Sequence, residues 1–479
     1  MITILQEQPR AFRMIFMLEL WERFGYYTVQ GILTLYFIRF IGLSDSEAYF
    51  AFGAFSALVY GMVSIGGYIG DHILGTKRTI ALGLATLTLG YLSLALTNKQ
   101  HVFLALGLIC VGNGLFKANP SNLLSKCYKD NDPRLHSAFT LYYMAINLGS
   151  IFSLFIGPAL ASHYGYSYSY FASFIGLILG NANYWFQRQH IKNIHTPADL
   201  KKIQHWKWGV IIIGILLVSV LASYLIQHVY LARKLLLLIT TMVLAVYLVY
   251  MRVESKSSAI RMIVALILMI EAIIFFVLYQ QMPTSLNFFA VHNVNPFLLG
   301  ISIDPQSFQA LNPIWIISLS PLLAMFYHYL QHRGISFPTP YKFAAGMFCC
   351  SLSFLLLYFS QFVHDENGIV SSVWLIGSYF FQASGELLVS ALGVAMVAEL
   401  VPRHITGFVM GMWFLTSSIA GFLGATVASF TALPKDVHPG IDSLTIYTHV
   451  FGWIGCVIFF ISVFMLIVAT QLSRFIKVC

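Results

Sequence analysis

The first apolar run of the sequence, residues 12–41, reads FRMIFMLELWERFGYYTVQGILTLYFIRFI. It is long enough to cross a hydrocarbon layer of about 30 Å as a helix, yet Glu19, Glu22 and Arg23 lie within it. Spacings of three and four residues place Glu19 on one helical face with both of the other charges. The same face continues with three polar side chains, Tyr26, Tyr27 and Gln30. Buried charges are retained in membrane helices mainly where they have a function. This polar stripe therefore indicates a functional site, and a structural salt bridge is the alternative.

The composition indicates that lipid, not water, surrounds most of the chain. Of 479 residues, 58% are hydrophobic and 9% are charged, and the mean hydropathy is +0.77, whereas soluble domains carry about 25% charged residues. Apolar runs of about 20 residues recur, and the alternation of a membrane β-barrel is missing. We therefore expect an all-α membrane protein that keeps its first apolar run as a spanning helix.

Apolar runs between basic, proline and glycine residues predict fourteen membrane helices. They are placed near residues 12–40, 47–73, 78–97, 101–125, 135–162, 165–187, 208–228, 232–252, 260–291, 307–331, 338–361, 371–400, 404–431 and 446–472. This pattern predicts an N-terminal six-helix bundle (1–187), a cytoplasmic linker with a two-helix hairpin (188–257), and a C-terminal six-helix bundle (258–479). Two bundles joined by a linker are typical of transporters whose substrate site lies near the membrane midplane between the halves.

Basic residues in the short loops predict that both termini are cytoplasmic, although Arg233 and Lys234 of the hairpin turn disobey this rule. The net charge of +9 is spread through these loops, so we expect no nucleic-acid partner. The six cysteines lack metal-binding spacing, and we expect reduced thiols, no metal and no cofactor.

Other polar residues also fall inside predicted spans. Lys117 lies deep in the run 101–125, and Glu386 is the one deep carboxylate of the run 371–400. Glu271 is deep in the run 260–291 without a nameable partner, so structural and functional roles stay equally open for it. Residues 67–78 read GYIGDHILGTKR, with Asp71 before a basic pair, and resemble the loop signature of the major facilitator superfamily.

The polar stripe of residues 12–41 also matches the signature of a known family. Residues 19–27 match the ExxERFxYY signature of the proton-coupled oligopeptide transporter (POT) family without a departure. Further matches follow along the whole chain at Tyr60, Lys117, Tyr143, Asn147, Asn312 and Glu386. The chain resembles this family, and most of all the di- and tripeptide permeases of Gram-negative bacteria, which also carry two extra helices between their bundles.

The resemblance implies a major facilitator fold and a symporter that imports di- and tripeptides and peptide-like compounds with protons. It implies proton coupling by Glu19, Glu22, Arg23 and Lys117, with Lys117 also binding the peptide carboxylate. No histidine falls in the middle of a predicted span, which likewise leaves proton carriage to carboxylates. Glu386 would bind the peptide ammonium. Peptide contacts are expected at Tyr26, Tyr27, Tyr60, Tyr143, Asn147 and Asn312.

The departures from the family concern gating. Many members pair an arginine of the first helix with a glutamate of the seventh as an outer gate, and this chain has Gln30 and Gln280 there. If only one of the two charges were lost, the other would be buried without a partner, and losing both avoids this cost. We therefore expect this gate to close through neutral hydrogen bonds and packing. Ala391 replaces a proline usual in the tenth helix, which leaves the bend of that helix open.

Two other functions are alternatives to peptide symport. Some relatives of the family carry nitrate or other anions, and such a substrate would make Glu386 dispensable. An intramembrane enzyme is disfavoured because HExxH, GxSxG and paired intramembrane aspartates are all missing. We expect a monomeric, multi-pass protein of the bacterial inner membrane whose partners are peptides, protons and the lipid bilayer.

Overall fold

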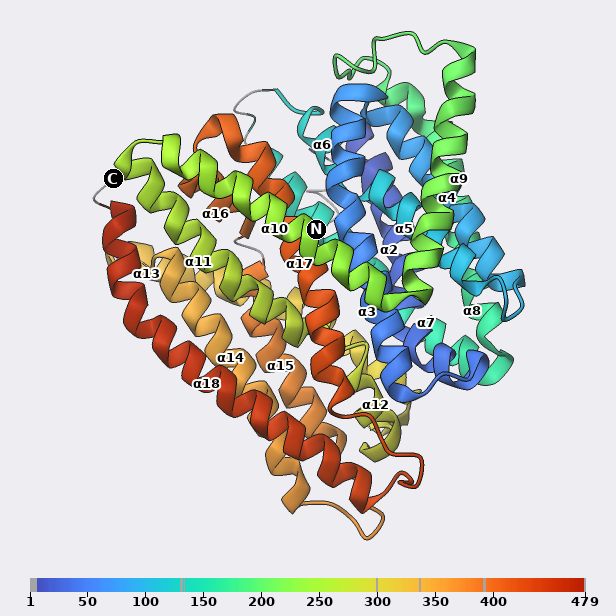
Figure 1. The fold of residues 1–479 in the computed structure, drawn as a ribbon, viewed down its shortest axis with the longest axis vertical. Helices are drawn as coiled ribbons and strands as arrows, with labels where there is room; N and C mark the ends of the chain where they lie inside the picture. The colour runs from blue at the N-terminus through green and yellow to red at the C-terminus, as the bar shows by residue number, and fades with distance from the viewer. Residues whose placement is uncertain are drawn as a thin grey trace. The chain divides into compact units, whose positions relative to one another are not determined.

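The computed structural model describes residues 7–129, 132, 134–298, 300–335, 337–390 and 393–477, and most of them are helical (Figure 1). Their one small sheet pairs strand β1 (Phe297–Leu298) with antiparallel β2 (Ile301–Ser302). The chain divides into two compact units. The first holds the described residues up to Gly42 and those from Ala54 to Ala232. The second holds Leu43 to Gly53 and the described residues from Arg233 onward.

The helices of the first unit follow the predicted spans. In chain order they are α2 (Arg10–Tyr36) with the π-helical η1 (Phe37–Ile41), α4 (Thr76–Leu96), α5 (Val102–Lys117), α6 (Asn119–Ser125), α7 (Arg134–Tyr164), α8 (Tyr166–Gln187) with η3 (Arg188–Ile191), and α9 (His205–Gln227). Helix α3 (Asp45–Tyr68), extended by η2 (Ile69–Ile73), begins in the second unit and continues in the first.

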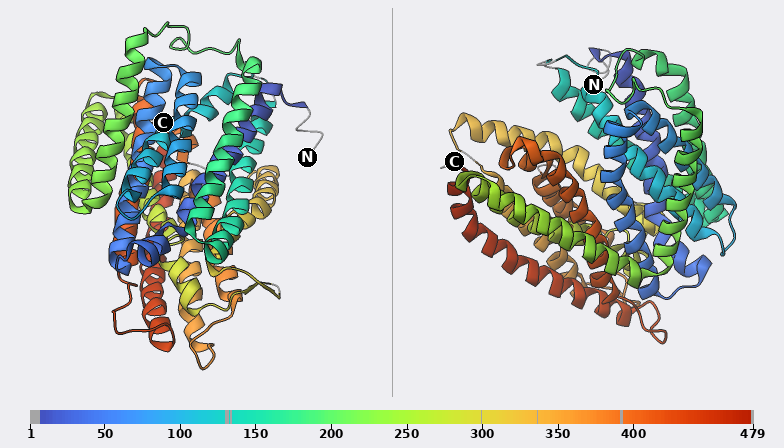
Figure 2. Two further views of the ribbon diagram at one scale, coloured as in Figure 1. Left: turned by 90° about the vertical axis from the view of Figure 1, so that its right-hand side faces the viewer. Right: turned by 45° about the horizontal axis from the view of Figure 1, so that its top comes forward.

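The second unit contains the remaining elements. They are α10 (Val229–Val253), whose first residues belong to the first unit, α11 (Lys256–Tyr279), α12 (Ser285–Asn293), η4 (Pro305–Ala310), α13 (Leu311–His332), α14 (Thr339–Phe359) with η5 (Ser360–Phe362), α15 (Ser372–Val389), α16 (Gly393–Leu400), η7 (Arg403–Ile405), α17 (Thr406–Ser429) and α18 (Ile441–Lys477). Helices α14 and α18 run side by side along this unit (Figure 1; Figure 2 gives two further views).

Eleven helices in the described part of the chain are long and apolar enough to cross a membrane. Helices also stand at the other three predicted spans, as α2, α8, and α15 followed by α16. The all-α membrane fold is therefore confirmed, while the count of fourteen spans stays a prediction.

Three predicted spans are interrupted. The span predicted near 260–291 ends at Tyr279 and resumes as α12, because Pro283 in the connecting turn has no N–H for a continuous helix. The span near 101–125 breaks between α5 and α6, where a proline occupies the first turn of α6. Helix α15 ends at Val389 and α16 begins at Gly393. Ala391, which stands where the family usually has a proline, lies outside the described residues.

The predicted linker is docked on the first unit. An oxygen of the Asp199 carboxylate accepts a hydrogen bond from the Lys77 backbone N–H (3.3 Å) at the start of α4. The Arg78 guanidinium donates to the carbonyl oxygens of Ala198 and Lys201 (3.5 and 2.9 Å). Gly75 precedes α4 with φ +89°, and a Cβ there would meet Asp199. These contacts tie the linker to the loop that carries the GYIGDHILGTKR sequence.

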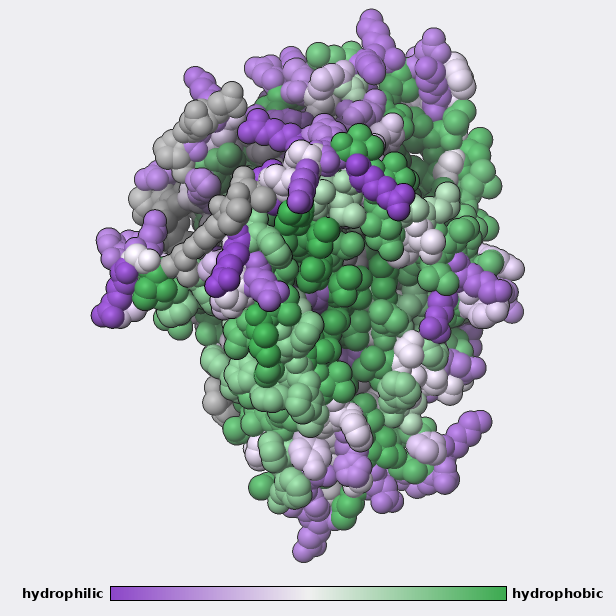
Figure 3. All heavy atoms as spheres, turned by 60° about the vertical axis from the view of Figure 1, so that its left-hand side comes forward, coloured by the Kyte–Doolittle hydropathy of each residue, from purple (hydrophilic) through white to green (hydrophobic). Residues whose placement is uncertain are grey.

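The outward faces of the helices are apolar. On the face shown in Figure 3, apolar side chains form a broad area between polar ends. Helix α10 is the extreme case, because only 6% of its apolar window is buried. Within its own unit it is anchored by the Tyr247 hydroxyl, which donates to the Met262 carbonyl of α11 (2.7 Å). A surface of this kind is suited to contact with lipid.

Glycines allow close crossings of the helices that carry the polar stripe. A Cβ at Gly66 of α3 would collide with the Gly114 carbonyl of α5. A Cβ at Gly149 of α7 would likewise collide with the Leu20 carbonyl of α2. Because small residues let helix backbones approach closely, these two crossings bring α3 to α5 and α7 to α2 at the depth of the buried charges.

We predict that Gly66→Ala destabilises the protein by about 1–3 kcal/mol, because the added methyl overpacks the crossing of α3 with α5. Thermal unfolding in detergent measures this as a lower unfolding temperature. Gly214→Ala in α9 is the matched control, since no atom lies within 4 Å of a Cβ there. Equal unfolding temperatures for the two variants would contradict the prediction.

Candidate functional site: buried charges of the two units

The stripe predicted on α2 forms a buried ion cluster. Glu19, Glu22 and Arg23 are each no more than 2% exposed. The Arg23 guanidinium lies 3.4 Å from a Glu19 carboxylate oxygen and 2.5 Å from a Glu22 oxygen. One cation therefore faces two carboxylates, and a bare set of three charges would leave one negative charge without a partner.

Two residues that were not predicted complete this cluster. The Tyr142 hydroxyl of α7 donates to Glu19 (2.6 Å), and the Asn113 side-chain amide of α5 donates to Glu22 (3.1 Å). Tyr142 stands directly before the predicted Tyr143, and Asn113 lies one helical turn before Lys117. Their signal in the sequence was a polar group inside an apolar run, but only the packing of α5 and α7 against α2 assigns their partners.

Lys117 is the last residue of α5 and lies against aromatic rings. Its ammonium is 4.0 Å from the ring centroid of Tyr60 and 5.8 Å from that of Tyr26. Such cation–π contacts stabilise a desolvated ammonium. Within the described residues no ion pair of Lys117 is found, and the carboxylates of α2 are bound to Arg23, Tyr142 and Asn113.

The second unit has a partly buried carboxylate of its own. The Asn312 side-chain amide, at the start of α13, donates to Glu386 of α15 (2.9 Å). The adjacent Trp315 indole N–H donates to the Ile376 carbonyl (3.2 Å), which ties α13 to α15. No described cation forms an ion pair with Glu386. The structure thus brings together Asn312 and Glu386, which sequence analysis had named separately.

The other predicted residues are distributed over both units. Tyr143 is 37% exposed, and the Asn147 amide donates to its carbonyl (2.8 Å). Gln30 of the first unit and Gln280 of the second are both buried. Asp71 is exposed and accepts a hydrogen bond from the Asn122 side chain of α6 (2.5 Å). Tyr27 stands edge-on to Tyr26, with ring centroids 5.4 Å apart.

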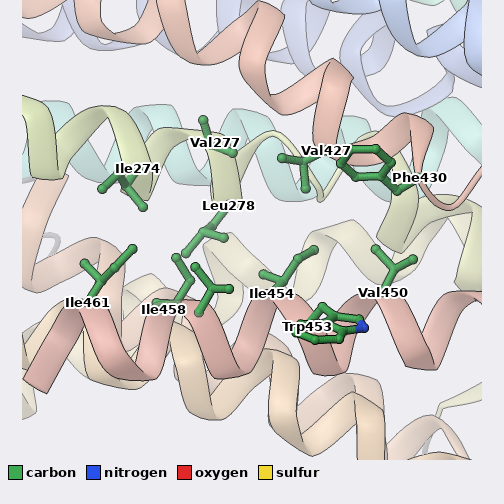
Figure 4. A pocket seen from close by; sticks show the side chains of 11 residues that line it. Ile274, Val277, Leu278, Val427, Phe430, Val450, Trp453, Ile454, Ile458 and Ile461 are labelled. Carbon is green, nitrogen blue, oxygen red and sulfur yellow. The ribbon is translucent and has the colours of Figure 1, made fainter.

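A groove on the second unit is unsuited to polar substrates. Its volume is about 490 Å³, and it lies between α11, α17 and α18 (Figure 4). The lining is aliphatic and aromatic throughout, with Ile274 and Leu278 facing Ile454 and Ile458. It offers no charged group to a ligand, so the polar residues described above remain the candidate site.

A family model described as the POT family matches residues 77–449 of the chain. The chain belongs to the POT family. The POT family consists of transporters and not of enzymes. The assignment of this chain to the family rests on a match across most of the sequence.

Curated relatives of the POT-family chain align over nearly their whole length. It is 46% identical to dipeptide and tripeptide permease B of Photorhabdus luminescens, over 98% of this chain and 97% of the relative. It is 47% identical to permease B of Salmonella typhimurium (99% and 98% covered). It is 46% identical to dipeptide and tripeptide permease A of Yersinia pestis (98% and 93% covered).

Solved structures of the POT family share the fold. Tetrameric PepTSo2 superposes with a TM-score of 0.87 at 33% identity and covers 97% of this chain and 99% of its own. A peptide transporter POT in complex with sulfate gives a TM-score of 0.84 at 26% identity, with 98% and 96% covered.

We predict that Tyr142→Phe lowers the free energy of unfolding by about 1–3 kcal/mol, because it removes the donor to the buried Glu19 carboxylate. Thermal unfolding in detergent is the measurement. Tyr170→Phe is the matched control, since this tyrosine is also buried and its hydroxyl has no hydrogen-bond partner in the described chain. In a double-mutant cycle, Glu19→Gln should couple to Tyr142→Phe and not to Tyr170→Phe. An absent coupling would contradict the assignment.

Proposed function

We propose that this chain is a proton-driven symporter that imports di- and tripeptides by alternating access. Its family and the names of its relatives support this class of substrate. The observation that carries the proposal is a partly buried ammonium, Lys117, which forms no ion pair within the described residues although it lies beside an ion cluster that holds two carboxylates. A cation kept in this way is available to a substrate carboxylate.

Proton coupling is assigned to the ion cluster of α2 together with Lys117. In the described arrangement Arg23 compensates one of the two carboxylates, and neutral donors serve the remaining oxygens. A proton added to Glu19 or Glu22 cancels one negative charge and weakens the hold on Arg23. The balance of charge around Lys117 then changes, so protonation and the binding of an anionic group at Lys117 become linked.

Peptide binding is assigned to opposite charges in the two units. Lys117 would bind the carboxylate end of the peptide, and Glu386 would bind its ammonium end, with Asn312 orienting the Glu386 carboxylate. Asn147 would add a hydrogen bond to the peptide backbone. The four tyrosines Tyr26, Tyr27, Tyr60 and Tyr143 offer amphipathic surfaces that tolerate varied peptide side chains.

The remaining assignments concern gating and cellular context. Gln30 and Gln280 are proposed as an outer gate without charges, and Asp71, held by Asn122, as part of the cytoplasmic gate. We place the protein in the inner membrane of a Gram-negative bacterium with both termini cytoplasmic. One chain is proposed to suffice for transport, although PepTSo2 is tetrameric in its crystals.

Uptake of labelled dialanine into proteoliposomes should require an inward proton gradient. Lys117→Ala should abolish this gradient-driven uptake, because coupling needs the ammonium. Peptide exchange without a gradient should survive but need more peptide, because the variant also lacks the contact to the peptide carboxylate. A pH-sensitive dye inside the vesicles reports the protons that enter with the peptide. Uptake that is equal with and without the gradient would overturn symport.

Glu386→Gln should weaken dialanine binding about 10- to 100-fold, the loss expected for a charge-assisted hydrogen bond. Isothermal titration of the purified protein measures this change. N-acetylated dialanine lacks the ammonium, and the variant should bind it as the unmodified protein does. Glu399→Gln, at an exposed position of α16, is the control. Unchanged dialanine affinity in Glu386→Gln would refute the role of Glu386.

A further inference from the structure

Glu271 is a buried carboxylate that the proposed mechanism does not use. It lies in the middle of α11 in the second unit and is 2% exposed. Neither of its carboxylate oxygens has a hydrogen-bond partner in the described part of the protein. A charged carboxylate in such surroundings would be very costly, since burial removes its hydration and nothing replaces it.

Three other glutamates, two of them buried and one partly buried, differ from Glu271 in this respect. Glu19 and Glu22 are bound to Arg23 and to neutral donors, and Glu386 accepts from Asn312. Each of these carboxylates has a donor for at least one oxygen. Glu271 has none, so the acid form is the one that its surroundings accommodate.

The helices packed against α11 supply no counter-charge to Glu271. Helix α10 contacts α11 through Tyr247, and its other titratable and charged groups are Tyr230, Arg233, Lys234, Tyr250 and Arg252. The other five helices are α14, α15, α16, α17 and α18. Helix α17 contains no acidic or basic residue. The titratable and charged groups on the other four are Tyr341, Lys342, Cys349, Cys350, Tyr358, Tyr379, Glu386, Glu399, Asp442, Tyr447, His449, Cys456, Arg474 and Lys477.

Two of these charged groups have partners of their own. The Lys342 ammonium stands over the Tyr327 ring, 4.6 Å from its centroid, and Glu386 is bound to Asn312. On α11 itself, Arg261 is ten positions from Glu271, about 15 Å along the helix axis. Among the described residues, Glu271 therefore forms no ion pair.

A second buried group without partners lies on a helix that packs against α11. Both the amide nitrogen and the amide oxygen of Gln382 in α15 lack hydrogen-bond partners in the described chain, and this side chain is 2% exposed. Gln382 lies one helical turn before Glu386. Buried polar groups of this kind are the ones that ordered waters satisfy, and waters also carry protons to and from a carboxylic acid.

We infer that Glu271 is a second proton-binding residue of the transport cycle, located in the second unit, with Gln382 lining its water path. Hydronium delivers one proton to the Glu271 carboxylate, which becomes a neutral acid, and water is released. The described conformation holds this proton, because no cation or donor among the described residues stabilises the anion. A conformation that admits water to Glu271 releases it. This inference rests on the proposed symport and adds a proton site apart from Glu19 and Glu22.

The test is the number of protons moved per dialanine in proteoliposomes, taken from dye and label in the same vesicles. Glu271→Gln, which mimics the neutral acid, should keep its unfolding temperature and still transport peptide. It should move one proton fewer per peptide than the unmodified protein. Glu399→Gln is the control and should keep the original ratio. An unchanged ratio in Glu271→Gln would overturn the inference.

Two further measurements keep the outcome decisive. If Glu271→Gln does not fold, Glu271→Leu is used instead, because leucine matches the neighbouring Leu268 and Leu278. The number of protons moved per dialanine is then measured for this variant, with the same expected result. Infrared difference spectra of the unmodified protein between high and low pH should contain a carboxylic acid band that either variant lacks. A Glu271 band that never changes with pH would also overturn the inference. Failure of the proposed function looks different, because the unmodified protein would then move no protons with dialanine.

Discussion

The ion pairs of Arg23 with Glu19 and Glu22 are the constraint around which the first unit is built. Three charges in the buried middle of a membrane helix are tolerated only when neighbouring helices supply what water would have supplied. Helix α7 supplies the Tyr142 hydroxyl and α5 supplies the Asn113 amide. The close approach of α7 to α2 depends in turn on the missing side chain of Gly149. At this depth, the close packing of the helices and the compensation of the buried charges therefore depend on each other.

The second unit meets the same constraint with fewer charges. Its paired carboxylate, Glu386, has one neutral donor, and Glu271 has none among the described residues. A carboxylate without a donor is compatible with burial only as a neutral acid. The two units therefore differ in kind, since the first compensates its buried carboxylates with a cation and the second keeps a proton on its buried carboxylate, Glu271. That contrast is the physical basis for placing proton binding in both units.

Most of the fold could be predicted because each helix must satisfy its own backbone in lipid. The apolar runs placed the helices, and the polar residues within those runs named the candidate site. The errors lie where backbone and side chains compete locally. The span near 260–291 was predicted as unbroken, although Pro283 interrupts it. Asn113 and Tyr142 were missed because a single polar residue in an apolar run does not reveal its partner.

By itself the sequence determined the membrane class and the family signature of residues 19–27. It also determined the set of polar residues whose burial in a membrane helix costs so much free energy that they indicate function. Hydropathy and helical periodicity suffice for this, because both act over one helix at a time. Only the tertiary structure decided which group meets which. It placed Tyr142 on Glu19, Asn312 on Glu386 and Lys117 on the ring of Tyr60, and it left Glu271 without a donor in the described chain. Those pairings depend on how separate helices cross, and close crossings such as those at Gly66 and Gly149 set them.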